Sequence, residues 1–134
     1  MIEPEDLLRL QAWFSPAFPV GAYAYSSGLE NAVGSGLVLG SDDLQQWLIS
    51  QLEDGPLWND AVLFAESWRA AGSDDALNEL NDLARALCFS AERQLETVAQ
   101  GGAFLISARA WGDVPAIEQE CTFSVAAGSV CGLH

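Results

Sequence analysis

Two serine-acid-acid triplets, each followed by leucines at helical spacing, divide this chain into helical segments. The triplets are Ser41-Asp42-Asp43 and Ser73-Asp74-Asp75. A serine at a helix start can cap the first turn, and acids there interact favourably with the helix dipole. Apolar residues follow each triplet at spacings of three and four, which places them on one face of a helix. No stretch alternates at period two for long enough to form a strand, so the pattern predicts an all-α fold with no sheet.

Turn residues predict about six to seven helices in one helical bundle, a single domain over residues 1–134. The expected segments are residues 4–13, a short helix near Gly28, Ser41 to the Gly55-Pro56 turn, residues 57–71, a helix after Ser73, a helix after Ser90 and a last segment from Pro115. Gly101 and Gly102 lie inside the helix after Ser90, where we expect either a bend or the close approach of another backbone. Small residues in the last segment favour close helix packing.

The charge balance of the chain excludes several classes of partner. The formal net charge is −14, and the chain contains no lysine. Such a surface repels nucleic acid and anionic membranes. A solvated acidic surface is the favoured interpretation of the charge, and attraction of a basic protein partner or cations is the alternative. Residues 1–14 carry acids where a secretory signal would be positive, and the three cysteines form no disulfide framework. We therefore expect a cytoplasmic protein with neither nucleic-acid nor membrane partners.

The inventory of reactive side chains is poor. The only histidine is the last residue, His134, and a serine or cysteine nucleophile needs a base within hydrogen-bond reach. No phosphate-binding loop with a lysine is present. Cys121, Cys131 and His134 supply at most three metal ligands, so buried thiols are the favoured interpretation. We expect no enzyme activity, no catalytic residue, no cofactor and no metal site. A direct metal carrier through these three residues and a small helical enzyme are the alternatives.

Two further features concern contacts with a partner. Glu53 and Asp54 lie at an expected helix C-terminus, where the helix dipole disfavours acids. A solvated helix end is the favoured interpretation, and a contact with a basic side chain of a partner is the alternative. Most of the five tryptophans are expected in the core, whereas Trp58 follows a helix-start turn and is a candidate interface anchor.

The most unusual segment is SPAFPVGAYAYSSGLE, residues 15–30. It contains Phe18, Val20, Tyr23 and Tyr25, which would form a large apolar patch if the segment were an exposed flexible loop. Its prolines reduce the entropy lost when the segment becomes ordered. The residues leave two interpretations open: the segment packs on its own domain, or it forms a rigid docking surface for another protein.

This segment, preceded by Leu7-Leu8-x-Leu10, closely resembles the N-terminal signature of the UreF family of urease accessory proteins. The resemblance continues through Trp47-Leu48, Glu92-Arg93 and Gly101-Gly102 to residues 123–133, so it covers essentially the whole chain. It implies an all-α, generally dimeric protein that is not itself a hydrolase. Members of the family are longer, so we expect this chain to lack their C-terminal helices.

The resemblance also implies partners. UreF proteins bind the accessory protein UreD, also called UreH, and the GTPase UreG. The assembly delivers nickel to the urease apoprotein, and UreF is thought to modulate the GTPase. We therefore expect a urease maturation chaperone, with a direct nickel carrier or a small helical enzyme as alternatives. The expected partner-binding residues are Ser15, Pro19, Gly21, Tyr23, Tyr25, Ser26, Gly28, Leu29 and Glu30.

Overall fold

The computed structural model describes residues 3–22, 26, 28–117 and 120–134, which form seven helices. The helices are α1 (Pro4–Trp13), α2 (Leu29–Gly34), α3 (Ser41–Glu53), α4 (Pro56–Arg69), α5 (Asp74–Ala86), α6 (Ala91–Ala108) and α7 (Phe123–Leu133). These ranges contain no strand, so the predicted all-α fold is confirmed. None of the helices in these ranges has the length and hydropathy needed to cross a membrane.

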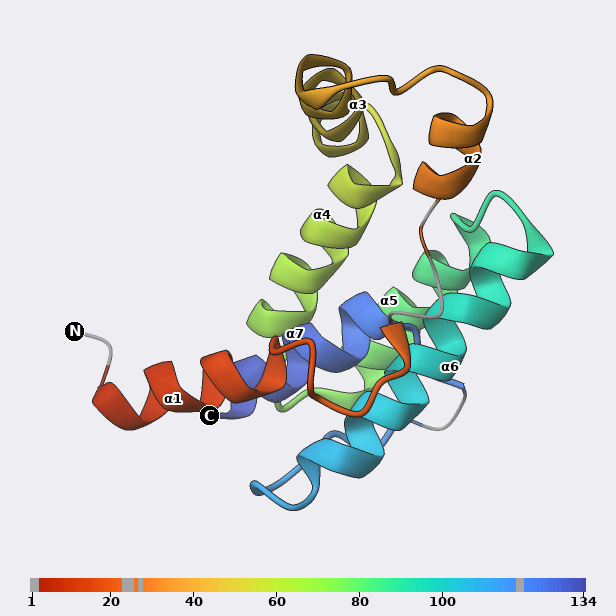
Figure 1. Ribbon diagram of the computed structural model, residues 1–134. Helices are drawn as coiled ribbons and strands as arrows, with labels where there is room; N and C mark the ends of the chain where they lie inside the picture. Colours follow the sequence, from red (N-terminus) through yellow and green to blue (C-terminus); the bar gives the residue numbers. More distant parts are fainter. Residues whose placement is uncertain (1–2, 23–25, 27, 118–119) are drawn as a thin grey trace.

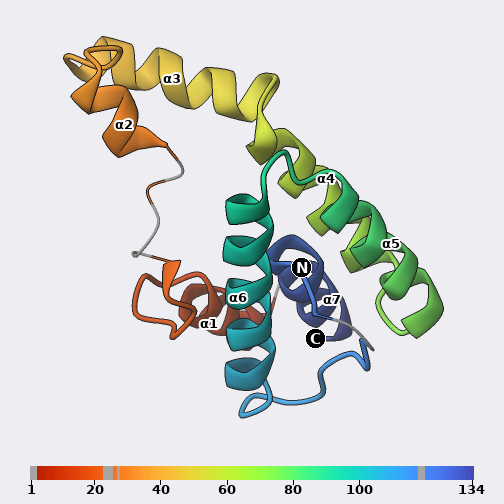
Figure 2. The same ribbon diagram turned by 90° about the vertical axis from the view of Figure 1, so that its right-hand side faces the viewer.

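Helix α7 lies at the centre of the bundle, where α4 and α6 pack against it (Figure 2). Every residue from Ser124 to Val130 is buried. A Cβ atom on Gly128 would overlap the carbonyl of Phe64, and one on Gly132 would overlap the carbonyl of Trp68. Because residues four apart share a helix face, the two glycines let α7 approach α4 closely. The close packing expected from the small residues is therefore confirmed.

The paired glycines of α6 have different surroundings. A Cβ atom on Gly101 would overlap the carbonyl of Cys121, whereas one on Gly102 would meet no atom within 4 Å. Helix α6 is continuous from Ala91 to Ala108 through both positions. Of the two expected reasons for a glycine here, the close approach of another backbone is confirmed at Gly101.

The chain enters α7 through a segment that side chains of α5 and α6 hold in place. Asn81, which is buried, donates from Nδ2 to the carbonyl of Glu120 at 3.0 Å and accepts from the Thr122 amide at 2.9 Å. Thr97 Oγ1 accepts from the Phe123 amide at 3.1 Å. The bonds to the Thr122 and Phe123 amides satisfy N–H groups that a helix start leaves without intrahelical partners.

Two expected helix starts need correction. The last segment becomes helical only at Phe123, because residues 113–117 and 120–122 form the crossing from α6 back to α7. Ser41 is the first residue of α3 and not its cap, since Gly40 occupies the cap position. Ser90 caps α6 as expected, because its Oγ accepts from the Arg93 amide at 3.1 Å.

The expectation that most tryptophans are core residues is wrong. Trp13 is buried, and its ring centroid lies 6.5 Å from that of Trp111. Trp58 and Trp68 on α4 are more than half exposed, Trp111 is also exposed, and Trp47 is half-buried. The described helices leave these faces open to solvent, and spacing along one helix does not show which faces another helix covers.

Helices α2 and α3 stand at one end of the molecule, away from α7 (Figure 1). We call residues 29–53 the α2–α3 arm. Helix α3 has no buried residue, and α2 buries only Ala32. Leu37 and Leu39, in the connection between the two helices, are 71% and 82% exposed. The arm therefore carries apolar side chains that the described part of the chain does not cover.

Candidate functional site

The structure divides the signature segment, residues 15–30, into two parts with different environments. In the first part, Ser15 Oγ accepts from the Ala17 amide at 3.1 Å, and the Ser15 carbonyl accepts from the Phe18 amide at 3.0 Å. The Phe18 ring lies 5.4 Å from that of Phe104 in the core. Pro19 and Gly21 follow as exposed residues. This part is a turn anchored on the helical bundle.

The second part of the segment starts α2. Gly28 is the N-cap residue, with a φ of +88° that an L side chain would adopt only with strain. The Ser26 carbonyl accepts from the Leu29 amide at 3.0 Å, and Ser26 Oγ accepts from the Glu30 amide at 3.5 Å. The expected short helix near Gly28 is therefore confirmed. Tyr23, Tyr25 and Ser27 lie outside the described residues.

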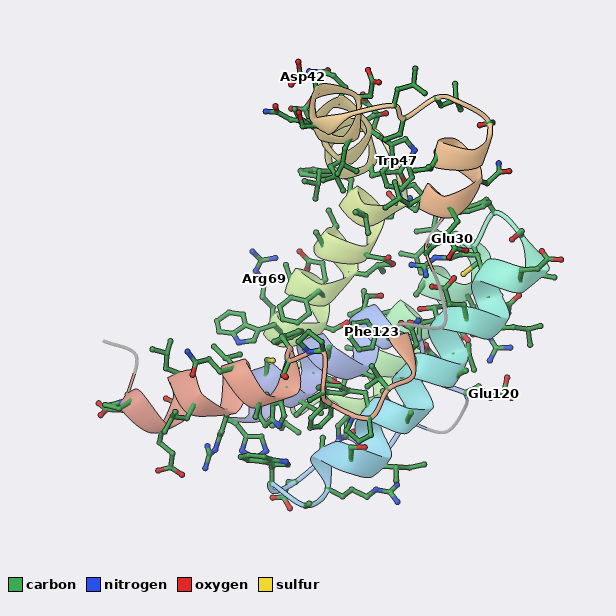
Figure 3. The ribbon with its side chains drawn as sticks, viewed as in Figure 1. Glu30, Asp42, Trp47, Arg69, Glu120 and Phe123 are labelled. Carbon is green, nitrogen blue, oxygen red and sulfur yellow. The ribbon has the colours of Figure 1, made fainter. Side chains whose placement is uncertain are left out.

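The second part also lines a groove of about 620 Å³, which we call the signature groove. Its walls come from the start of α2, from α3, and from the first turns of α4 and α6. In Figure 3, Glu30 and Trp47 mark its α2 and α3 sides. The lining residues are Ser26, Gly28, Leu29, Glu30, Trp47, Leu48, Gln51, Pro56, Leu57, Phe89, Ser90, Glu92, Arg93 and Glu96.

Of the seven predicted partner-binding residues that the structure describes, four line the groove and three do not. Ser26, Gly28, Leu29 and Glu30 line the groove, whereas Ser15, Pro19 and Gly21 belong to the anchored turn at the end of α1. The partner role of all nine stays a prediction.

Sequence reasoning missed Phe89, which lines the groove and is 73% exposed. The sequence did contain a signal that Phe89 is exposed. An apolar residue directly before a helix cap often packs on the fourth helical residue, but in α6 that residue is Gln94. Phe89 therefore has no apolar partner at this position of its own helix, which favours exposure.

The polar part of the groove centres on Arg93. Its side chain, 19% exposed, contacts Asp60 at 2.5 Å and Glu96 at 3.3 Å. Burial raises the pKa of Asp60 more than the neighbouring Arg93 lowers it. With one arginine facing two acids, and with Glu30 and Glu92 also lining the groove, the polar lining is acidic. It favours a cationic group on whatever binds.

The three residues of the metal-carrier alternative do not meet at one place, because Cys131 and His134 line one hollow and Cys121 does not. Cys121 precedes α7 and Cys131 lies near its end, so that about 12 Å of helix, from Phe123 to Cys131, separates them. Burial raises the pKa of Cys121 to about 12 and that of Cys131 to about 11, so both are protonated thiols at neutral pH. Within the described ranges, no group of three histidine, cysteine or acidic side chains could hold a metal ion.

The enzyme alternative gains no support from His134. Its ring lies 5.7 Å from that of Trp13, and its Nε2 is 3.2 Å from the carbonyl of Asp113. His134 does not line the signature groove, so it is not placed to activate a nucleophile there.

Comparison with known proteins identifies the family. The UreF family model matches residues 38–134, a region that starts after the signature segment. Among curated relatives, urease accessory protein UreF 1 of Brucella canis is 51% identical over 130 residues, 96% of this chain and 57% of the relative. UreF of Mesorhizobium japonicum is 50% identical over 128 residues, 94% of this chain and 57% of the relative.

A third relative covers slightly more of this chain. UreF of Rhizobium etli is 46% identical over 134 residues, 98% of this chain and 60% of the relative. The chain thus spans little more than half the length of the curated relatives it matches. No solved structure matches it. The match of the family model to most of the chain, on an all-α structure, shows that the chain belongs to the UreF family.

Proposed function

We propose that this chain acts in urease maturation as a scaffold in a complex of UreD, UreF and UreG. In this role it supports nickel insertion into the urease apoprotein and modulates the UreG GTPase. It works in the cytoplasm as a homodimer, and it performs no catalysis of its own. Membership in a family of urease accessory proteins supports the role in urease maturation. The signature groove supports the role as a scaffold.

One observation carries the scaffold role: the signature groove is apolar, open and built from four separate helices or their starts. Leu48, Leu57 and Phe89 in its lining are 42%, 36% and 73% exposed. Contiguous exposed apolar surface of this kind is typical of protein interaction sites. The acidic lining adds selectivity for partners with basic groups, because charge complementarity steers association.

The test is co-elution of the chain with purified UreD and UreG, read by size-exclusion chromatography with light scattering. We expect a stoichiometric complex with the wild-type chain. The double variant Tyr23→Ala/Tyr25→Ala should weaken it or reduce self-association, while circular dichroism shows the helices intact.

A matched control removes two exposed apolar side chains of α6 that do not line the groove. Leu95 and Ile106 are 71% and 68% exposed, so Leu95→Ala/Ile106→Ala should leave co-elution unchanged. Unaltered complexes with the tyrosine variant would count against the signature segment as an interface. Failure of the wild-type chain to bind either protein would contradict the scaffold role of this chain.

A further inference from the structure

Three hollows of the surface meet at Pro56 and Phe89. These residues line the signature groove, a second hollow of about 450 Å³ beside α2 and α3, and a third of about 230 Å³ between α4 and the end of α5. Pro56 opens α4, and Phe89 directly precedes the cap of α6. An exposed phenylalanine ring surrounded by three hollows can be enclosed by a partner on several sides, as interface hot spots are.

Acidic side chains line the same hollows as Pro56 and Phe89, which form the apolar centre of this surface. Asp54 lines the third hollow, and Glu92 lines the signature groove. Neither side chain forms an ion pair with an arginine among the described residues. Arg93 is the only basic residue in the described lining of the three hollows, and Asp60 and Glu96 already pair with it. The surface thus offers unpaired negative charge beside an apolar centre.

The position of Asp54 adds a second argument. Asp54 is the C-cap residue of α3, where the negative end of the helix dipole disfavours a carboxylate. The charge therefore contributes nothing favourable to its own helix. A cationic group of a partner would interact favourably with both the carboxylate and the helix end.

We propose that the surface around Pro56 and Phe89 binds a partner segment with bulky apolar side chains flanked by lysine or arginine. The apolar side chains enclose Phe89, and the cationic groups pair with Asp54 and Glu92. This inference rests on the proposed function only in taking the occupant to be a protein. It adds the chemistry of the occupant and the residues that recognise it.

The probe for the test is a labelled amphipathic peptide of leucine and lysine, with a leucine-glutamate peptide as its counterpart. Binding to the whole chain is measured by fluorescence anisotropy at low and high salt. We expect the lysine peptide to bind with an affinity that falls as salt rises, and the glutamate peptide not to bind. Asp54→Asn/Glu92→Gln and Phe89→Ala should each weaken binding by about fivefold or more.

The control variant Glu53→Gln/Asp75→Asn matches the test variant in charge and position. Glu53 is the last residue of α3, next to Asp54, and Asp75 holds in α5 the helical position that Glu92 holds in α6. Neither lines the three hollows. Both double variants remove two negative charges, so general attraction to an acidic protein would weaken equally in the two. We expect the control to change the affinity by less than about twofold.

The outcomes separate this inference from the proposed function. Equal weakening in the two double variants, an unchanged affinity of Phe89→Ala, or no binding of the lysine peptide would overturn the inference. Co-elution of UreD and UreG with the wild-type chain is scored independently. If those proteins bind while the peptide results fail, the scaffold role stands and only the occupant assigned here is wrong. Thermal unfolding of each variant distinguishes lost contacts from lost fold.

Discussion

Helix α7 and the α2–α3 arm are both helical, yet they differ in what covers them. Residues 124–130 of α7 are all buried, and glycines bring its backbone close to that of α4. Helix α3 has no buried residue, although Leu44, Trp47, Leu48 and Leu52 form the apolar stripe expected of a packed helix. A helix of small and apolar residues thus forms the core, whereas an amphipathic helix with a clear apolar stripe lies on an open surface.

An apolar stripe on a helix shows which side chains that helix can bury. It does not show whether another helix will cover them. In α7, small side chains allow two neighbouring helices to come close from different sides. In the arm, large side chains project from a helix that only α4 contacts extensively. An uncovered stripe of this kind is suited to a partner protein.

The largest expected effect contrasts two phenylalanines. Phe104 is fully buried, with the rings of Phe18 and Phe123 at 5.4 and 5.7 Å, whereas Phe89 is 73% exposed. Phe104→Ala should lower the free energy of unfolding by about 3–5 kcal/mol, because it removes buried area and leaves a cavity. Phe89→Ala should change it by less than about 0.5 kcal/mol. Urea unfolding of both variants checks this, and similar losses would contradict the contrast.

A second prediction concerns the entry to α7. Asn81→Ala removes both bonds that hold the segment at Glu120 and Thr122, and it leaves the buried Thr122 amide without its acceptor. We expect a loss of about 2–3 kcal/mol of unfolding free energy. Asn31→Ala, at an exposed position of the arm, is the control and should be close to neutral. Hydrogen exchange of the Thr122 amide, faster in the first variant alone, would locate the effect.

The paired glycines of α6 test the contrast between covered and open surface, because a change to alanine adds a single methyl group at each position. Gly101→Ala should destabilise the fold by about 1–3 kcal/mol, because its Cβ overlaps the Cys121 carbonyl. Gly102→Ala should stabilise it by up to about 1 kcal/mol, since the site is open and alanine favours a helix. Thermal unfolding measures both: stabilisation by both variants would show that the crossing at Gly101 is not tight, and destabilisation by both would show that the site at Gly102 is not open.

The smallest effect depends on pH. The pKa of Cys121 rises from its ordinary value near 9 to about 12 in the fold because the thiol is buried. Above pH 9 the unfolded chain releases this proton while the folded chain keeps it, so stability falls as pH rises from 9 to 12. At pH 10 the loss from this group is about 1 kcal/mol. Cys121→Ala should remove that part of the decrease between pH 8 and pH 10, which urea unfolding at both values measures.

Much of the helical pattern could be predicted from local signals. The helix that opens with Pro4, the one that follows Gly55-Pro56 and the one that Ser90 caps all occur where the sequence places them. The start of α7 could not be predicted, because Pro115 favours a helix start locally, whereas α7 begins at Phe123, where Asn81 and Thr97 accept from the amides of Thr122 and Phe123. Those contacts join residues far apart in sequence.

The candidate site was predictable only in part. Unusual composition drew attention to residues 15–30, but it did not indicate that Phe18 would pack on the core while Glu30 would line a groove. Phe89 and Arg93 join the groove from a helix start nearly sixty residues further along the chain.

By itself, the sequence determined the helical character of the chain, its acidic surface and its likeness to one family. These depend on composition, short spacings and a contiguous motif, which are properties of neighbouring residues. Only the tertiary structure decided which apolar faces are covered, why Gly101 must be glycine while Gly102 need not be, and which residues share a groove. Burial is the physical reason, since it depends on which distant segments come together, and periodicity along one helix carries no information about its neighbour.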